Sequence, residues 1–202
     1  MPHIASAKDR ALDLARTKGI ARARDFAAAG IARTYLQRLV GEGRLVRLGR
    51  GLYQLADVDL AAGHSLAEAA RVVPHGVICL LSALQFHELT TQTPHQVWMM
   101  IGLRKWTPTT CPVGLRIVRA TGEALSAGIG HHVIEGVTVP IYEPAKTVAD
   151  CFKHRSKIGL DVAIEALRDC LRRKRCTIDQ LWHFAGLCRV QTVMRPYLEA
   201  QL

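Results

Sequence analysis

The sequence predicts an α+β fold with a small unit of three helices and a β-hairpin at residues 1–57, followed by a mixed α+β domain at residues 64–202. Two observations lead to this prediction. Helical periodicity occurs three times before residue 42 and gives way to two short strand patterns. After a stretch of small and mixed residues at 56–63, strand patterns and helical patterns are interspersed, and the chain ends in helical patterns alone.

Residues 4–17 form the first helical pattern, which places small and apolar side chains on one stripe: Ala7, Ala11, Leu14 and Ala15. Lys18-Gly19 should end this helix, and an extended link is expected at residues 20–22. A second helix follows at residues 24–29. Gly30 is expected to end it, because glycine adopts the left-handed conformation found after helix ends.

The third helix is predicted from a clear division of its surface. At 100° per residue, one arc holds the apolar side chains Tyr35, Leu36, Leu39 and Val40. The opposite arc holds Arg33, Thr34, Gln37, Arg38 and Gly41. No carboxylate lies between residues 33 and 41, so this polar face would not repel a phosphate. Glu42-Gly43 should end the helix.

Residues 45–48 and 52–55 read as two strands joined by Gly49-Arg50-Gly51, a connection with the length and composition of a tight hairpin. Three helices followed by such a hairpin is the element order of a winged helix-turn-helix. In that fold the third helix enters the major groove of DNA, and the hairpin, or wing, lies against the neighbouring backbone or in the minor groove.

Double-stranded DNA is therefore the expected partner. Arginine suits guanine or phosphate, glutamine suits adenine and threonine suits either, so the expected contacts on the third helix are Arg33, Thr34, Gln37 and Arg38. Arg47 and Arg50 are the expected wing contacts, and Arg22 and Arg24 the expected contacts to flanking phosphates. The alternative is a protein-binding winged helix whose arginines are merely solvated.

The distribution of charge favours the DNA hypothesis. The chain has a formal net charge of +10. Residues 1–57 carry 11 Lys/Arg against 5 Asp/Glu, a net +6, whereas residues 58–202 carry 16 against 12, a net +4. A concentrated basic excess of this kind favours a polyanionic partner.

The six scattered cysteines show neither C-x-x-C nor zinc-finger spacing, so buried or half-buried thiols are expected. Because no signal peptide pattern and no apolar run of about 20 residues occurs, a cytoplasmic protein that does not enter the membrane is expected.

The second domain is predicted from short patterns. Capping boxes are expected at Ser65–Glu68 and Thr177–Gln180, and a helix over residues 77–84. The expected strands are 97–101, 115–118, 133–135 and 137–142, the last two forming a hairpin around Gly136. The expected final helices are 144–155, 160–173, 178–187 and a short one near Tyr197.

The histidines and the serine of this domain do not form a catalytic pattern. His131 and His132 are neighbours beside a strand, where side chains point to opposite faces. Ser82 and His87 lack a G-x-S-x-G elbow and an orienting aspartate. Neither pair therefore predicts a metal site or a hydrolase.

Acidic residues also fail to predict an active site. A metal-dependent nuclease would use a cluster such as Asp150, Asp161, Glu165 and Asp169. However, Glu165 and Asp169 have arginines beside them on the polar side of an amphipathic helix, which is typical of a solvated surface. The expectation is a protein that is not an enzyme and that holds no metal or cofactor. A nucleic-acid-processing enzyme is the alternative.

The basic run Arg172–Arg175 has two interpretations. It follows a predicted helix, where cations stabilise the negative end of the helix dipole. If it lies on the same side as the wing, it extends the surface available to DNA.

The segment GIARARDFAAAGIARTYLQRLVGEGRLVRLGRGLYQL resembles the winged-helix start of AbiEi-type antitoxins, the regulators of bacterial type IV toxin-antitoxin systems. The residues that carry the resemblance are Gly30, Leu36, Leu39, Val40, Gly43, Leu45, Arg50, Gly51 and Tyr53. The second half is also similar, in Leu81-Ser82-Ala83-Leu84, His87, Leu89-Thr90 and residues 144–150.

This resemblance implies a transcriptional autorepressor that binds inverted repeats in its own promoter. It also implies that the C-terminal domain neutralises an AbiEii-like nucleotidyltransferase toxin, a separate chain, without a stable complex. Some relatives carry a nuclease-like C-terminal domain, but its acidic motif is absent from this sequence.

Overall fold

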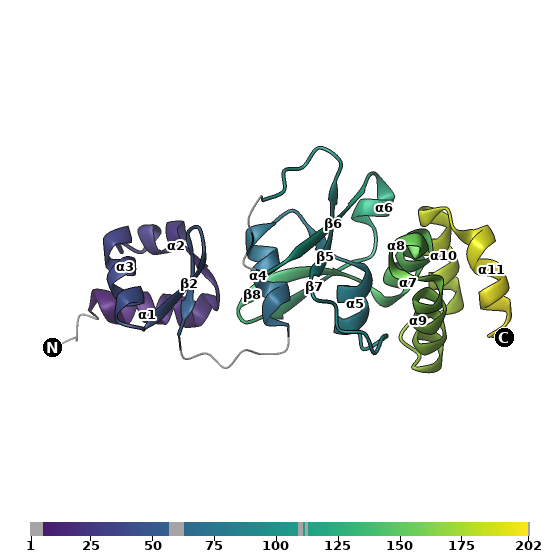
Figure 1. Ribbon diagram of the computed structural model, residues 1–202, viewed down its shortest axis with the longest axis horizontal. Helices are drawn as coiled ribbons and strands as arrows, with labels where there is room; N and C mark the ends of the chain where they lie inside the picture. The colour runs from purple at the N-terminus through teal and green to yellow at the C-terminus, as the bar shows by residue number, and fades with distance from the viewer. Residues whose placement is uncertain (1–5, 57–62, 109–110, 112, 202) are drawn as a thin grey trace.

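The computed structural model describes residues 6–56, 63–108, 111 and 113–201. A small group of helices with a hairpin lies at one end, a mixed sheet lies in the middle, and a group of helices lies at the other end (Figure 1). The predicted α+β fold is therefore confirmed. The predicted boundary between two domains falls at residues 57–64, most of which lie outside the described residues, so that division stays a prediction.

The N-terminal part has the expected order of elements. They are α1 (Ala7–Lys18), β1 (Ala21–Arg22), α2 (Ala23–Ala28), α3 (Arg33–Gly41), β2 (Leu45–Gly49) and β3 (Leu52–Leu55). The wing strands β2 and β3 are antiparallel, and the predicted extended link is strand β1, which pairs with β3 on its other side. This is a winged helix-turn-helix with a three-stranded sheet.

Local sequence accounts for the ends of these helices. The Ser6 side chain accepts a hydrogen bond from the Asp9 backbone while the Asp9 side chain accepts one from the Ser6 backbone, a capping box that starts α1. Gly19 (φ 61°) and Gly30 (φ 73°) adopt positive φ after α1 and α2. Both predicted helix ends are thus confirmed, because glycine alone enters this region without strain.

A small apolar core holds the winged helix together. Phe26 of α2 packs edge-to-face on Tyr53 of β3, with ring centroids 5.9 Å apart. Leu36 and Leu39 of α3 are fully buried in the same cluster. The apolar arc of α3 is therefore the side that anchors the helix.

The second part contains a sheet with helices on both of its faces. Its elements are α4 (His64–Val72), β4 (Val77–Ile78), α5 (Leu80–Phe86), β5 (Val97–Gly102), β6 (Leu115–Ala120), α6 (Glu123–Ser126), β7 (Ile129–Ile134), β8 (Val137–Tyr142), α7 (Pro144–Lys153), α8 (Arg155–Ile158), α9 (Leu160–Arg172), α10 (Ile178–Cys188) and α11 (Gln191–Glu199). The strand order is β6-β5-β4-β8-β7, with β4–β8 and β5–β6 parallel and the other pairs antiparallel.

Strand β5 shows how the sheet separates two cores. Val97, Met99 and Ile101 belong to the core that includes α4, whereas Trp98 and Met100 belong to the core that includes α7, α9 and α10. Successive side chains on a strand point to opposite faces, so an unbroken apolar strand indicates a sheet covered on both sides.

Two local predictions are wrong. The run at residues 77–84 is not one helix: Val77 and Ile78 pair with β5 as strand β4, and α5 begins at Leu80. Periodicity cannot separate a strand from a helix in so short an apolar run. Ser65 does not cap α4, which begins one residue earlier at His64 after Gly63. The capping box at Thr177 and Gln180 is confirmed.

The winged helix packs closely against the tip of the β7–β8 hairpin. Gly136 at that tip faces the carbonyl oxygen of Thr17, and a Cβ atom added to Gly136 would lie 2.7 Å from it. Gln54 Nε2 donates a hydrogen bond to Glu135 Oε2 at 3.1 Å. Ile20 shares a core with residues of the second part. The two parts therefore contact each other through both apolar and polar groups.

A buried ion pair lies in the second part. Lys146 Nζ and Asp150 Oδ2 are 2.5 Å apart on α7, and both side chains are buried. The Cys188 thiol donates to the other oxygen of Asp150 at 3.2 Å, and Lys146 lies over the ring of Tyr142. Burial raises the pKa of Asp150. The positive charge of Lys146 opposes this rise without cancelling it.

All six cysteines are free, and each is buried or half-buried, as expected from the sequence. Within the part of the chain that the structure describes, no helix has the length and apolar character needed to span a bilayer.

Exchanging Gly136 for alanine should loosen the contact between the two parts. Both Gly136 (φ 70°) and Gly43 (φ 67°) have positive φ, but a Cβ at Gly43 meets nothing within 4 Å. We expect Gly43→Ala to lower the free energy of unfolding by about 1 kcal/mol, through backbone strain alone. Gly136→Ala should lower it further, as measured by chemical denaturation. Equal effects of the two substitutions would contradict a close contact at Gly136.

Removing one partner of the buried ion pair should be strongly destabilising. Lys146→Met leaves Asp150 buried without its cation, and we expect a loss of about 3–5 kcal/mol in the free energy of unfolding. Lys153→Met, at an exposed position of the same helix, should change it by less than about 0.5 kcal/mol. The double substitution Lys146→Met with Asp150→Leu should recover most of the loss. Urea denaturation of the wild type and the three variants measures the free energy of unfolding. An unchanged value for Lys146→Met would contradict a stabilising role of the ion pair.

Candidate nucleic-acid interface

The polar face of α3 is exposed. Thr34, Gln37 and Arg38 are open to solvent, as is Arg33, while Leu36 and Leu39 on the other side hold the helix in the core. Helix α3 also lies at the end of the molecule that is far from the second part (Figure 1). The second part therefore does not cover the surface that the sequence predicts to contact DNA.

The N-terminus of α3 is suited to an anion. Its N-cap residue, Ala32, forms no side-chain capping hydrogen bond, and the first turn carries Arg33 and no acidic residue. The first backbone N–H groups of a helix have no partner within the helix, and the helix dipole is positive at this end. The start of α3 can therefore attract a phosphate through both the backbone and Arg33.

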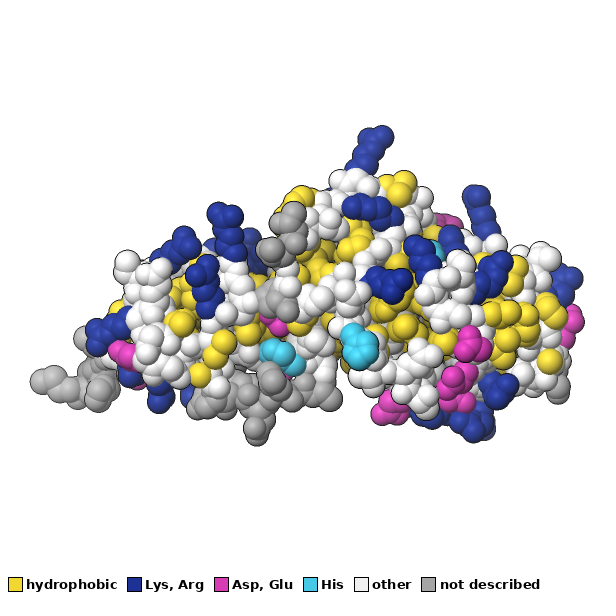
Figure 2. Space-filling view, in the orientation of Figure 1, with side chains coloured by type: hydrophobic (Ala, Val, Ile, Leu, Met, Phe, Trp, Pro, Cys, Tyr) yellow, Lys and Arg dark blue, Asp and Glu magenta, His cyan; other side chains and the backbone are white. Residues whose placement is uncertain are grey.

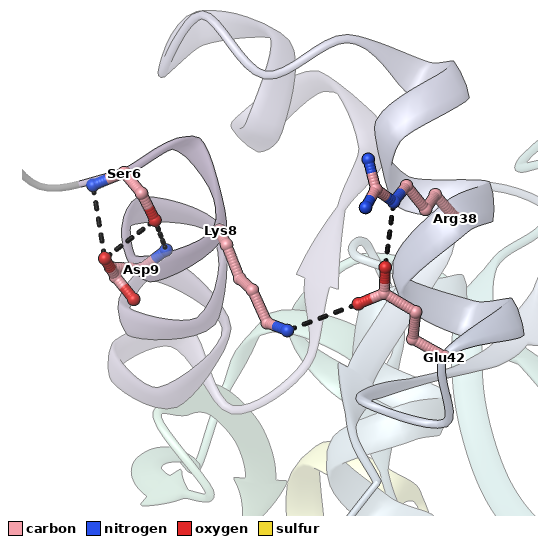
Figure 3. Close-up of polar contacts among 5 residues, drawn as sticks. All are labelled: Ser6, Lys8, Asp9, Arg38 and Glu42. Atoms are coloured by element: carbon pink, nitrogen blue, oxygen red, sulfur yellow. Dashed lines mark hydrogen bonds and ion pairs between the residues drawn. The ribbon is translucent and has the colours of Figure 1, made fainter.

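The C-terminal end of α3 is less basic than the sequence suggests. Arg38 Nε donates to Glu42 Oε1 at 2.8 Å, and Lys8 Nζ of α1 lies 3.3 Å from Glu42 Oε2 (Figure 3). Hydrogen bonds from Arg38 and Lys8 lower the pKa of Glu42, which keeps it ionised. A carboxylate thus follows directly after the carboxylate-free stretch and pairs with an expected DNA contact.

The wing brings its tip to the start of α2. The Ala23 N–H donates to the Gly51 carbonyl at 2.8 Å, and Gly51 takes a positive φ of 74°. Arg47 and Arg50 are exposed, and Arg47 Nε donates to the Gly49 carbonyl at 3.2 Å beside a register shift in the hairpin. The hydrogen bond between Ala23 and Gly51 brings the neighbouring Arg50 to the same side as the start of α2.

A hollow of about 670 Å³ lies between the wing, the start of α2 and the second part. Its lining includes four arginines: Arg22, Arg24, Arg50 and Arg71. Arg24 is exposed, but Arg22 is half-buried and its Nη2 donates to the carbonyl oxygen of Arg71. The structure thus brings Arg24 and Arg50 together and places Arg22 deeper than a contact to a flanking phosphate requires.

Lys and Arg side chains project from the N-terminal part on the face seen in Figure 2. The other basic run lies elsewhere: Arg172 ends α9, at the opposite end of the molecule from the wing (Figure 1). Arg172 and Arg173 pair with Asp169, and Arg175 pairs with Glu88. These contacts agree with a local role at the end of α9.

The serine and histidine considered as catalytic candidates have separate partners. Ser82 Oγ accepts a hydrogen bond from the Trp98 N–H at 3.0 Å, and His87 Nε2 is 2.7 Å from the Tyr142 carbonyl oxygen. His132 packs against Phe86, whereas its neighbour His131 is exposed. Ser82, His87 and His132 thus each have a structural contact of their own.

Among the residues that the structure describes, no group of three or more His, Cys, Asp or Glu side chains is placed to hold a metal ion. Of the four acidic candidates, Asp150 is buried against Lys146, and Asp169 pairs with arginines of its own helix end. They do not converge on an open site.

Four residues that shape this surface are not among the contacts predicted from the sequence: Lys8, Glu42, Arg71 and Trp106. The pairing of Arg38 with Glu42 has a sequence signal, since charges four residues apart on a helix lie side by side. Lys8, Arg71 and Trp106 are far apart in the sequence from the residues they meet, so no local pattern indicates them.

The chain is similar to solved structures in its fold and to a protein family in part of its sequence. A crystal structure of the RV2827C protein from Mycobacterium tuberculosis is similar with a TM-score of 0.63 and 15% sequence identity, over 91% of this chain and 72% of that chain. At this identity the similarity concerns the fold alone. A search of curated proteins found no match.

The sequence similarity concerns the winged helix. A family model described as "Transcriptional regulator, AbiEi antitoxin" matches residues 9–56, the segment that contains α2, α3 and the wing. The resemblance stated from the sequence is confirmed for this segment. Over residues 9–56, the chain is thus similar to the AbiEi antitoxins, a family of transcriptional regulators.

Proposed function

We propose that this protein is a DNA-binding autorepressor and the antitoxin of a type IV toxin-antitoxin system. The similarity of residues 9–56 to AbiEi transcriptional regulators supports a role as regulator or antitoxin. The observation that carries the DNA-binding proposal is the exposed polar face of α3, anchored by Leu36 and Leu39 and left uncovered by the second part.

In this proposal α3 lies in the major groove. Thr34 and Gln37 contact base edges, and Arg33 and Arg38 contact bases or phosphates, as their donor and acceptor groups allow. Arg47 and Arg50 of the wing and Arg24 at the start of α2 contact the backbone. Arg22 would need to leave the Arg71 carbonyl to join them.

Regulation follows from where the DNA site lies. Inverted repeats in the promoter of the protein's own operon would bind two copies, one on each half-site, and exclude the polymerase. The toxin would be a separate nucleotidyltransferase of the AbiEii type, neutralised without a stable complex. The similarity to AbiEi antitoxins supports this part of the proposal.

Substitutions on α3 and at the wing tip should affect binding differently. Gln37→Ala should lower the preference for the cognate site by about 1–3 kcal/mol, because base contacts carry sequence information. Arg50→Ala should weaken cognate and random duplexes alike. Electrophoretic mobility shift with the upstream region and a shuffled duplex measures both. If Gln37→Ala lowered the affinity for the two duplexes by the same factor, a base contact by Gln37 would be contradicted.

Salt should weaken the complex steeply. If about six phosphates are neutralised, affinity falls about a thousandfold between 50 and 200 mM salt. Fluorescence anisotropy of a labelled duplex across this range gives the slope. A protein that keeps its affinity at high salt would instead indicate the protein-binding alternative.

Glu42→Gln should strengthen DNA binding. The substitution frees Arg38 and Lys8 from the carboxylate they share, so the salt slope should grow by about one phosphate contact. Asp169→Asn is the matched control, because it removes a carboxylate that also pairs with two cations, at the far end of the chain. Anisotropy titrations of both variants test this. An equal gain in both would show an effect of net charge alone.

A further inference from the structure

The hollow between the wing and the second part has an unusual lining. It receives Arg22, Arg24 and Arg50 from the winged helix and Arg71 from α4, and Trp106 is also part of its lining. Its volume of about 670 Å³ is in the range of sites for small ligands. We call it the junction pocket.

Positive charge in the junction pocket exceeds the negative charge that could balance it. Arg22, Arg24 and Arg71 lie close enough for their charges to act on one another, and burial with these neighbours lowers the pKa of Arg22 and of Arg71. The charge of Asp25 opposes this effect at both Arg22 and Arg71, because a nearby carboxylate raises the pKa of a guanidinium. Asp25 already accepts hydrogen bonds from the Arg22 backbone and from Lys18. An anion in the pocket would relieve this repulsion.

Arg71 retains hydrogen-bonding capacity. Its Nη2 donates to the Lys18 carbonyl at 3.4 Å, and its Nε is buried without a hydrogen-bond partner among the described residues. A guanidinium has five N–H donors and matches the oxygens of a phosphate well. A buried donor without a partner is costly, so an acceptor that reached this Nε would relieve that cost.

Trp106 adds an aromatic surface. It is 67% exposed, and its carbonyl oxygen accepts a hydrogen bond from His75 Nε2 at 3.0 Å, which holds its backbone. Apolar side chains such as Leu48 and Val72 also line the pocket. A flat ring placed here would gain stacking and apolar contact.

We propose that the junction pocket binds a small phosphate-bearing compound with a planar ring, of the nucleotide class. The arginines would hold its phosphates, and Trp106 would contact its ring. Duplex DNA would not satisfy the same groups, because Arg22 and Arg71 are half-buried. Duplex phosphates would meet the exposed Arg24 and Arg50 at the rim.

One consequence rests on the proposed function. Since Arg24 and Arg50 belong both to the pocket and to the expected DNA contacts, a bound ligand would draw them from the DNA backbone. The compound would then lower the affinity for DNA, as an effector of a repressor does.

The test uses the full chain without DNA, so its outcome does not depend on the proposed function. Isothermal titration calorimetry at constant ionic strength compares inorganic triphosphate with ATP. We expect one saturable site for each, with ATP binding more tightly because of its ring. Trp106→Ala should remove the advantage of ATP and leave the binding of triphosphate unchanged.

Two variants test the arginines. Arg71→Gln should weaken triphosphate about tenfold or more through loss of charge-assisted hydrogen bonds. Arg24→Gln, at an exposed position, should also weaken the binding of triphosphate. It provides the test if Arg71→Gln lowers the melting temperature of the protein. Arg168→Gln, at an exposed position of α9, is the matched control and should leave binding unchanged.

Three results would overturn the proposal. The first is no saturable heat with either compound at millimolar concentration, including the case in which only duplex DNA binds. The second is equal binding by Arg24→Gln, Arg71→Gln and Arg168→Gln, which would show a general charge effect. The third is an advantage of ATP that persists in Trp106→Ala.

Discussion

The burial of one side of α3 is the constraint on which the rest of the winged helix depends. Leu36 and Leu39 are fully enclosed with Phe26 and Tyr53, and this core fixes the rotation of the helix about its axis. Because side chains follow one another at about 100° on a helix, fixing the apolar side also fixes where the polar side points. The same contacts that stabilise the unit thus present its polar face to solvent. Stability and the proposed recognition of DNA follow from one packing arrangement.

Attachment of the winged helix to the second part adds a further constraint. The end of α1 lies against the tip of the β7–β8 hairpin, where Gly136 leaves no room for a side chain, and Gln54 binds Glu135 beside it. A contact made by backbone atoms at both sides leaves little freedom for the two parts to slide. It also places Arg71 of α4 beside the start of α2. The junction pocket is a consequence of this attachment, because neither part forms it alone.

Much of the fold could be predicted from local sequence. Glycines at positions 19 and 30 end helices because of their backbone freedom, and the two-fold division of α3 follows from its periodicity. The wing, the hairpin around Gly136 and the final helices have equally local causes. The short apolar run at residues 77–84 was one exception, since its first residues become a strand by pairing with β5 and β8, which lie distant in the sequence. Such pairing leaves no trace in the periodicity of a short run.

The sequence by itself therefore determined the order of the elements, the apolar side of α3 and the excess of positive charge near the N-terminus. Tertiary structure decided which of the basic residues can act together. It paired both Arg38 and Lys8 with Glu42, withdrew Arg22 toward Arg71, and placed Trp106 in the lining of the same pocket. The physical reason is the range of the interactions. Capping, turns and periodicity act within a few residues along the chain, whereas ion pairs and pockets depend on distances in space that only the packed chain fixes.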